Sequence, residues 1–285
     1  MKNLTIAVLL IGSLFFVSCS KNDAGSGYTT ITNAYYGTDS KQTMDVYLPD
    51  GRSIATTKAI IMIHGGGWTG GDKADFAAMV DTIKKRMPGY AIYNINYRLS
   101  AAPNNLFPAQ EQDVRAAMNF IYSKGPEYQV SDKYIILGAS AGGHLAMLQA
   151  YKYADPVKPK AVVSFFGPSD LTDMYDHPVG GNTILSAALA AAVGATPTQN
   201  PSIYIDSSPA GFISSTSAMP TILLHGGADP LVDPNQSVLV QTKLANAGIV
   251  NQYVLYPSGG HGDWDAATYT DAFNKIQAFI QANVQ

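Results

Sequence analysis

Residues 134–144 read Tyr-Ile-Ile-Leu-Gly-Ala-Ser-Ala-Gly-Gly-His, an apolar run that leads into a Gly-x-Ser-x-Gly motif. The run Tyr134–Leu137 predicts a buried strand, and the residues after the motif predict a helix. A motif in this strand–turn–helix context indicates a nucleophile elbow, a tight turn that exposes the hydroxyl of Ser140. Gly138 and Gly142 lack Cβ atoms, so the turn can be sharp and neighbouring chain can pack closely. The alternative is a structural Gly/Ser turn without chemistry.

Short apolar runs alternate with stretches of helical period on both sides of this motif, from about Tyr28 onward. This alternation is typical of βα units and predicts an α/β fold, with a mostly parallel central sheet and helices on both faces. The expected strands are Met44–Leu48, Ala59–Ile63, Ala91–Asn96, Tyr134–Leu137, Ala161–Phe166, Thr221–Leu224 and Gln252–Tyr256. The expected helices are Ala74–Met87, Pro108–Ser123, Ala141–Tyr153, Asn235–Ala247 and Ala267–Ala282.

One segment interrupts the alternation. Between Phe166 and Thr221 the chain holds turn signals, an Ala-rich patch and a stretch rich in Pro, Ser and Tyr. A connection of that length in a compact domain is more often a lid or a wall of a binding site than an idle loop. We therefore expect a small lid insertion at about residues 168–218. The alternative is a single extra helix packed on the surface.

A serine hydroxyl is a weak nucleophile near neutral pH and needs an adjacent base. In nucleophile-elbow enzymes the order along the chain is Ser, acid, His, so the base follows the final strands. His261 is the expected base because it lies in a Gly-rich loop, Ser258–Gly262, between the last expected strand and helix. We expect a packing role for His144 and a place in the lid for His177. His64 is expected to anchor a loop by hydrogen bonding.

The acid should follow a strand between the nucleophile and the base. The strand Thr221–Leu224 leads into His-Gly-Gly-Ala-Asp229-Pro-Leu-Val-Asp233. Asp229 lies at the C-terminal end of that strand, where the active sites of α/β proteins collect. There it would hold the tautomer of the base and stabilise its protonated form. Asp233 is the alternative acid, although its place just before the expected helix equally suits an N-cap.

Residues 63–68, Ile-His-Gly-Gly-Gly-Trp, also follow an expected strand. Three successive glycines let backbone N–H groups converge on a developing oxyanion without obstruction by side chains. The N–H of Ala141, directly after the expected nucleophile, supplies the other donor. The glycines from Gly65 onward also fit the dinucleotide-binding pattern Gly-x-Gly-x-x-Gly, which requires an acidic residue at the end of the next strand. Residues 94–98 there read Asn-Ile-Asn-Tyr-Arg, so the oxyanion loop is favoured.

The N-terminus predicts export. Residues 1–18 hold one basic residue, an apolar run and then small residues, the pattern of a secretory signal peptide. Cys19 follows directly and resembles the lipidated cysteine of bacterial lipoproteins, so we expect a lipid anchor there and a flexible tether over residues 19–28. This predicts a lipid-anchored protein of the cell envelope, periplasmic or on the outer surface, with an ordinary secreted protein as the alternative. Cys19 is the only cysteine, which excludes intramolecular disulfides.

The composition excludes several other classes. Of 285 residues, 46% are hydrophobic and 14% are charged, so the chain can form a packed core. The 18 Lys and Arg against 21 Asp and Glu give a net charge of −3, which offers no electrostatic basis for binding nucleic acid. No later apolar run is long enough to cross a membrane, so we expect membrane contact only through the N-terminal anchor. The sequence shows no metal-ligand spacing and implies no protein partner.

Several motifs in this order carry a resemblance to a known family. They are HGGGW (64–68), YRL (97–99), GASAGGH (138–144), HGGAD (225–229) and SGGHGDW (258–264). Together they resemble α/β-hydrolase serine esterases of the hormone-sensitive-lipase-like group. The resemblance is strongest to bacterial carbohydrate esterases of the bifunctional feruloyl and acetyl-xylan esterase-like subgroup, and it covers residues 43–285.

The resemblance implies an α/β-hydrolase fold and a serine carboxylesterase that needs no cofactor or metal. The residues it implies are Ser140 as nucleophile, Asp229 as acid, His261 as base, and the N–H groups of Gly66, Gly67 and Ala141 as oxyanion hole. The implied substrates are small acyl, acetyl or feruloyl esters, on small molecules or plant polysaccharide. The subgroup also resembles formamidase-like and peptidase-like relatives, so an amidase or serine peptidase with the same triad is an alternative. A non-catalytic surface binding module is another.

Overall fold

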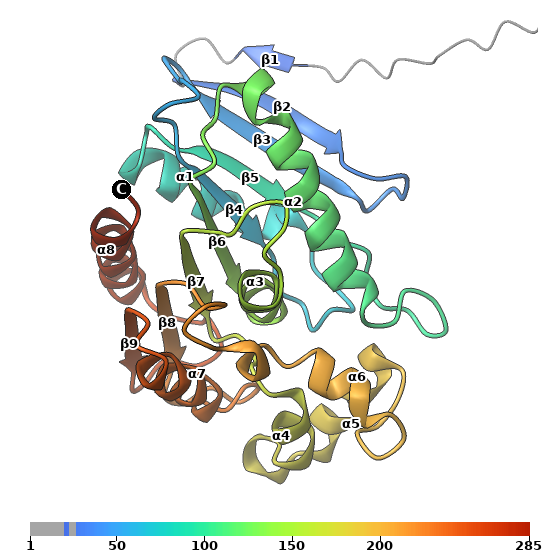
Figure 1. The fold of residues 1–285 in the computed structure, drawn as a ribbon. Coiled ribbons are helices and arrows are strands. Elements are labelled where there is room, and N and C mark those ends of the chain that lie inside the picture. The colour runs from blue at the N-terminus through green and yellow to red at the C-terminus, as the bar shows by residue number, and fades with distance from the viewer. Residues whose placement is uncertain (1–19, 23–26) are drawn as a thin grey trace, which may run out of the picture.

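The computed structural model describes residues 20–22 and 27–285. The predicted signal peptide, Cys19 and residues 23–26 of the predicted tether lie outside the described residues. A nine-stranded sheet in the order β1-β2-β3-β5-β4-β6-β7-β8-β9 forms the centre of the described part (Figure 1). The strands are β1 (Ser20–Asn22), β2 (Tyr28–Tyr35), β3 (Thr43–Pro49), β4 (Ala59–Ile63), β5 (Ala91–Ile95), β6 (Tyr134–Ala139), β7 (Ala161–Phe165), β8 (Thr221–Gly226) and β9 (Asn251–Tyr256).

The sheet has an antiparallel and a parallel part. Strands β1, β2, β3 and β5 pair antiparallel in turn, whereas β5, β4, β6, β7, β8 and β9 pair parallel. Every residue of β4 to β8 is buried, as expected of strands that are covered on both faces. The predicted α/β fold with a mostly parallel sheet is confirmed.

Helices cover both faces of the sheet, and each face has its own hydrophobic core. Apolar residues of α1 and α8 pack in one core, and those of α2, α3 and α7 pack in the other. The helices are α1 (Ala77–Arg86), α2 (Ala109–Tyr128), α3 (Ala141–Lys152), α7 (Asn235–Asn246) and α8 (Ala266–Asn283). Because the parallel strands all point the same way, the loops that follow them meet at one edge of the sheet.

The structure differs from the sequence prediction near the N-terminus. The apolar pattern does not predict β2, and Ser20–Asn22 lie in the predicted tether, yet they pair with β2 as a short strand. An edge strand presents unpaired N–H and C=O groups that even a polar segment can satisfy. The predicted helix Ala74–Met87 is divided, because a 3₁₀ turn, η1 (Lys73–Phe76), precedes α1 and is capped by Asp72.

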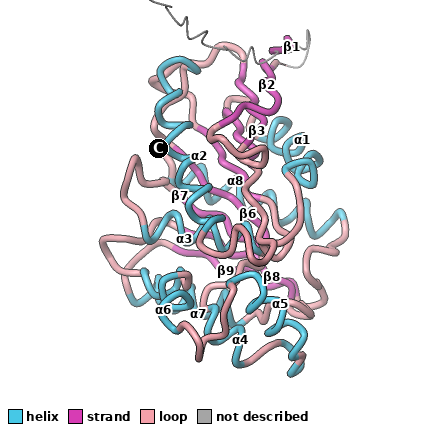
Figure 2. The backbone as a smooth tube through the Cα atoms, turned by 90° about the vertical axis from the view of Figure 1, so that its right-hand side faces the viewer, coloured by secondary structure: helices cyan, strands magenta, loops and turns pink. Residues whose placement is uncertain are grey.

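The insertion between β7 and β8 forms several short helices, so the alternative of a single extra helix is wrong. They are α4 (Leu171–Asp176), η2 (Val179–Gly181), α5 (Thr183–Val193), α6 (Pro201–Asp206) and η3 (Pro209–Phe212). Figures 1 and 2 show α4, α5 and α6 gathered at the end of the molecule opposite β1. Among the described residues, no helix combines the length and the apolar character that a membrane span requires.

Candidate active site

Ser140 occupies the tight turn between β6 and α3 that the sequence predicts. Its φ of 54° and ψ of −124° lie in a region that non-glycine residues rarely adopt and that costs about 1–3 kcal/mol. A hydrogen bond from the surrounding structure stabilises this strained backbone, because the Ser140 N–H donates to the carbonyl of Phe165 at 2.8 Å. A Cβ on Gly142 would lie 1.9 Å from the carbonyl oxygen of Ile63, so the first turn of α3 can approach β4 only because this residue is glycine.

The structure brings Ser140, His261 and Asp229 together although they lie far apart in the sequence. His261 Nε2 is 2.8 Å from Ser140 Oγ, and His261 Nδ1 is 2.7 Å from Asp229 Oδ2. Asp229 follows β8 and His261 follows β9, so adjacent parallel strands deliver both side chains to the same edge. The alternative acid, Asp233, instead accepts the N–H of Asn235 at 2.8 Å, at the start of α7.

The carboxylate of Asp229 is buried, accepts two backbone N–H groups and contacts two imidazoles. Oδ1 accepts the backbone N–H groups of Leu231 and Val232 at 2.8 and 3.0 Å. Oδ2 lies 2.7 Å from His261 Nδ1 and 3.3 Å from His225 Nε2. Burial alone would raise the pKa of Asp229, but the hydrogen bonds from His225, His261 and Val232 outweigh it, so the pKa lies well below its ordinary value. Asp229 is therefore a fixed negative charge beside the imidazole.

His225 is a member of this site to which the sequence analysis assigned no role. It is fully buried, and its Nε2 faces two acceptors, the Val232 carbonyl at 3.0 Å and Asp229 Oδ2. Nε2 must therefore carry a proton, while Nδ1 lies 2.7 Å from the hydroxyl of Ser237. The sequence signal is the spacing of four residues between a histidine near the end of a strand and the acid.

The three expected oxyanion donors differ in their position relative to the cavity beside Ser140. Gly67 and Ala141 line the same cavity as Ser140 and His261, whereas Gly66 does not line it. Gly66 has a φ of 107°, and its carbonyl accepts the N–H of Gly70 at 2.9 Å, so it shapes the loop. Within the described part of the chain, the N–H groups of Gly66, Gly67 and Ala141 all lack a protein acceptor. Those of Gly67 and Ala141 also belong to residues that line the cavity.

Two buried histidines, His64 and His144, support this loop. The ring of His64 stacks on Tyr97 with centroids 4.3 Å apart, and Tyr97 donates to the His64 carbonyl at 3.1 Å. His144 Nδ1 accepts the indole N–H of Trp68 at 3.2 Å, and its Nε2 donates to the Ser207 carbonyl at 2.7 Å. Burial lowers the pKa of His144 to about 4. The neutral His144 therefore joins the glycine loop, the nucleophile helix and the insertion.

A cavity of about 170 Å³ adjoins the Ser140 hydroxyl. The insertion contributes one wall, and β8–α7 loop residues contribute another. The lining residues from these two segments are Pro168, Met174, Leu185, Ala188, Leu189, Leu231 and Val232. The cavity is therefore mainly apolar, with the polar groups of the candidate site converging at one side, and the insertion is a wall of it.

Comparison with known proteins places this arrangement in a family. Residues 44–244 match the family model BD-FAE, which is more than half of the chain. The chain belongs to the BD-FAE family. The match includes Ser140 and Asp229 and ends before the loop that carries His261, which the structure supplies.

The BD-FAE chain is similar to several named proteins. It is 33% identical over 202 residues to the probable carboxylic ester hydrolase LipM of Mycobacterium tuberculosis, covering 66% of this chain and 45% of LipM. It is 34% identical over 127 residues to the kynurenine formamidase avaC of Aspergillus versicolor, covering 39% of this chain and 44% of avaC. A solved truncated carbohydrate esterase from gut microbiota is 27% identical, with a TM-score of 0.75 over 91% of this chain and 99% of that one. The chain spans about half the length of the curated relatives it matches.

Phe166 is a second residue of this BD-FAE site to which the sequence analysis assigned no role. It follows β7 with a φ of 41°, an unusual backbone for a bulky residue. Its N–H donates to the carbonyl of Leu224 at 2.8 Å, and its ring lies 4.5 Å from that of His261, centroid to centroid. Phe166 thus forms the wall behind the imidazole. No sequence pattern signals a positive φ at a phenylalanine.

The described residues contain no group of three or more His, Cys, Asp or Glu that could hold a metal ion.

Proposed function

We propose that this protein is a serine carboxylesterase that hydrolyses esters of small acyl groups through an acyl-enzyme intermediate. The observation that carries the proposal is the continuous hydrogen-bonded chain from Ser140 Oγ through His261 to Asp229, with distances of 2.8 and 2.7 Å. Membership of the BD-FAE family and the similarity to a named carboxylic ester hydrolase support the same reaction.

In the first half-reaction, Ser140 Oγ attacks the ester carbonyl carbon while His261 Nε2 takes the hydroxyl proton. Asp229 accepts the Nδ1–H of His261, which leaves Nε2 free to act as the base and stabilises the imidazolium that forms. Negative charge develops on the carbonyl oxygen, and the N–H groups of Gly67 and Ala141 receive it. The C–O bond then breaks, and the alcohol leaves with the proton from His261.

In the second half-reaction, water attacks the acyl-enzyme carbonyl and His261 Nε2 takes its proton. The tetrahedral intermediate collapses, His261 returns the proton to Ser140 Oγ, and the carboxylic acid leaves. The two half-reactions use the same donors and the same base, so one site serves both.

The small cavity favours acetyl over the bulkier feruloyl group. Its volume of about 170 Å³ is below the ~300–1,000 Å³ of sites for drug-sized ligands. Acetyl or feruloyl groups on plant polysaccharide are the substrates we infer from the family resemblance and from the similarity to a carbohydrate esterase. A release assay on acetylated and feruloylated xylan, read by mass spectrometry, tests this substrate class.

The mechanism is tested with a fluorophosphonate probe followed by peptide mapping. We expect one adduct per chain, on Ser140. The Ser140→Ala variant should lose both the adduct and the hydrolysis of p-nitrophenyl acetate. Ser202→Ala is the matched control, because Ser202 is exposed on the insertion and should keep both. Labelling elsewhere, or full turnover by Ser140→Ala, would overturn the proposal.

An amidase with the same triad is the second candidate, and the similarity to a kynurenine formamidase favours it. The two candidates differ in the leaving group that His261 must protonate, an alcohol or an amine. Comparing kcat/KM for matched acetyl esters and anilides separates them: we expect the ester to be preferred, and preference for the anilide would assign an amidase.

The location of the protein is a separate proposal. We propose that it is exported and anchored by a lipid on Cys19, from the signal-peptide pattern and the cysteine that follows it. Metabolic labelling with a clickable fatty acid should mark the wild-type protein in the membrane fraction, whereas Cys19→Ser should remain unlabelled. Absence of label on the wild type would leave the secreted alternative.

A further inference from the structure

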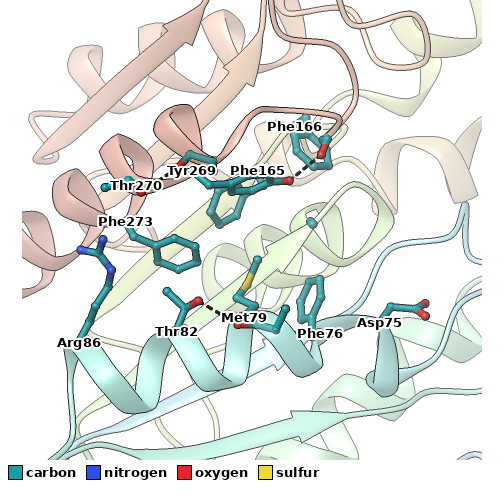
Figure 3. A pocket seen from close by; sticks show the side chains of 14 residues that line it. Asp75, Phe76, Met79, Thr82, Arg86, Phe165, Phe166, Tyr269, Thr270 and Phe273 are labelled. Atoms are coloured by element: carbon teal, nitrogen blue, oxygen red, sulfur yellow. Dashed lines mark hydrogen bonds between the residues drawn. The ribbon is translucent and has the colours of Figure 1, made fainter.

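A second and larger cavity lies between α1 and α8, on the face of the sheet opposite α3. Its volume is about 570 Å³, within the range of small-molecule sites. Figure 3 shows side chains of both helices and of the end of β7 pointing into it. The aromatic side chains among its lining are Phe76, Phe165, Phe166, Tyr269 and Phe273.

This cavity is separate from the catalytic one. No residue lines both. The two lie back to back, because Ala139 and Gly262 line the second cavity while their chain neighbours, Ser140 and His261, line the first. Phe166 forms the shared boundary, since it lines the second cavity and contacts the imidazole of His261.

A charged side chain lies at each end of the cavity, and the two differ in how much of their hydrogen-bonding capacity the protein already uses. Arg86 lies at one end (Figure 3), and its Nη1 donates to Asn274 Oδ1 at 2.7 Å. A guanidinium has five N–H donors, and no other acceptor for the Arg86 side chain occurs among the described residues. Asp75 lies at the other end, where its Oδ2 accepts the backbone N–H of Asp72 at 2.9 Å. The Asp75 carboxylate is thus used in the cap of η1, whereas the Arg86 guanidinium still has N–H donors without an acceptor.

We propose that this cavity binds an aromatic carboxylate, with the carboxylate on Arg86 and the ring among the phenylalanine side chains. The Arg86 guanidinium lies 5.9 Å from the centre of the Phe273 ring, so a ring attached to the bound carboxylate reaches Phe273 directly. Phe165 lies next to it, with ring centroids 6.2 Å apart and planes at 52°. This tilted pair offers both a ring face and a ring edge to a third aromatic ring. The proposal does not depend on the proposed hydrolytic activity.

The protein contains a reporter for this site. Trp264 packs against two residues that line the cavity, at 5.6 Å from Phe166 and 5.4 Å from Tyr269 between ring centroids. The experiment is a titration of the Ser140→Ala protein with 3-phenylpropionate, followed by calorimetry and by indole fluorescence. We expect saturable binding of one ligand per chain. Its neutral amide should bind about tenfold more weakly, because the charge-assisted hydrogen bond to Arg86 is lost. Octanoate should also bind more weakly than 3-phenylpropionate.

Two pairs of variants locate the binding. Arg86→Gln should weaken binding about tenfold, whereas Lys85→Gln removes an exposed charge from the same helix outside the cavity and should not. Thr82→Phe fills the second cavity and should abolish binding, whereas Ala188→Phe fills the catalytic cavity and should leave it unchanged. Thermal unfolding of each variant checks that it is folded. Absence of saturable binding, equal affinity for octanoate, or loss of binding in Ala188→Phe rather than Thr82→Phe would overturn the proposal.

Discussion

His225 Nε2 lies 3.3 Å from Asp229 Oδ2, the same oxygen that receives His261 Nδ1. Both partners of this contact are fully buried, so neither water nor salt weakens it. One carboxylate oxygen thus lies between two imidazoles, one in the reacting group and one behind it. This arrangement fixes the direction in which Asp229 faces His261.

Replacing His225 should impair catalysis without weakening substrate binding. In His225→Phe the carboxylate loses its contact with one of two imidazoles, and we expect kcat to fall about ten- to a hundredfold with little change in KM. His225→Gln keeps an N–H donor and should recover part of kcat. An equal loss of kcat in both variants would indicate a merely structural role.

Acid should destabilise the protein through His144. Its pKa is lowered from 6.5 to about 4 in the folded chain, so folding favours the neutral imidazole. The associated stability is complete above about pH 6.5 and declines as the pH falls towards 4. By linkage the loss at pH 4.5 is about 2–3 kcal/mol.

The measurement is urea unfolding of the wild type and of His144→Leu between pH 7 and 4.5. His144→Leu should lose less stability on acidification than the wild type, although it starts lower. Parallel curves for the two proteins would contradict the assignment.

Two glycines of the site should tolerate alanine very differently. In Gly142→Ala the new Cβ would lie 1.9 Å from the carbonyl of Ile63, so we expect no soluble folded protein. In Gly67→Ala the nearest atom is Thr69 Oγ1 at 3.9 Å, so only the left-handed backbone costs stability, about 1–2 kcal/mol. Solubility and thermal unfolding distinguish the two, and a well-folded Gly142→Ala would show that the elbow is looser than described.

The size of the catalytic cavity should set the acyl-chain preference. Activity on p-nitrophenyl esters should fall from acetate to octanoate, because Met174 and its neighbours close the cavity. Met174→Ala should raise the ratio of kcat/KM for octanoate to that for acetate about tenfold. Ile184→Ala is the control, since Ile184 is 75% exposed on the same insertion. An unchanged ratio in Met174→Ala would place the acyl group elsewhere.

Local sequence patterns predict much of the fold and of the site. They fail to decide where one residue fits two patterns equally well. The apolar runs predict the parallel strands because burial on both faces leaves few polar residues in them. The elbow is predictable because its glycines are sterically required. The choice between Asp229 and Asp233 is less certain from sequence, since a residue before a helix satisfies the N-cap pattern as well as the active-site pattern. Only the contact with His261 decides it.

Other features depend on contacts between distant segments. The role of His225 depends on the fold of the β8–α7 loop, and that of Phe166 on a positive φ that no residue pattern indicates. The antiparallel strand β2 lacks a continuous apolar run because it lies near the edge of the sheet, half-exposed along much of its length. Short helices such as α4 and α6 span too few turns for a periodic pattern to emerge.

The wall that the insertion forms is fastened at both ends. At its start, the N–H groups of Ser169 and Asp170 donate to Gln236 Oε1, each at 2.8 Å. Near its far end, His144 binds the carbonyl of Ser207. Between these two points, the carbonyl of Ala192 accepts the hydroxyl of Ser100 at 2.9 Å and the N–H of Phe107 at 3.2 Å. A bulky polymer therefore meets a wall whose outline is set before the polymer binds, and the nucleophile, acid and base keep their positions when it does.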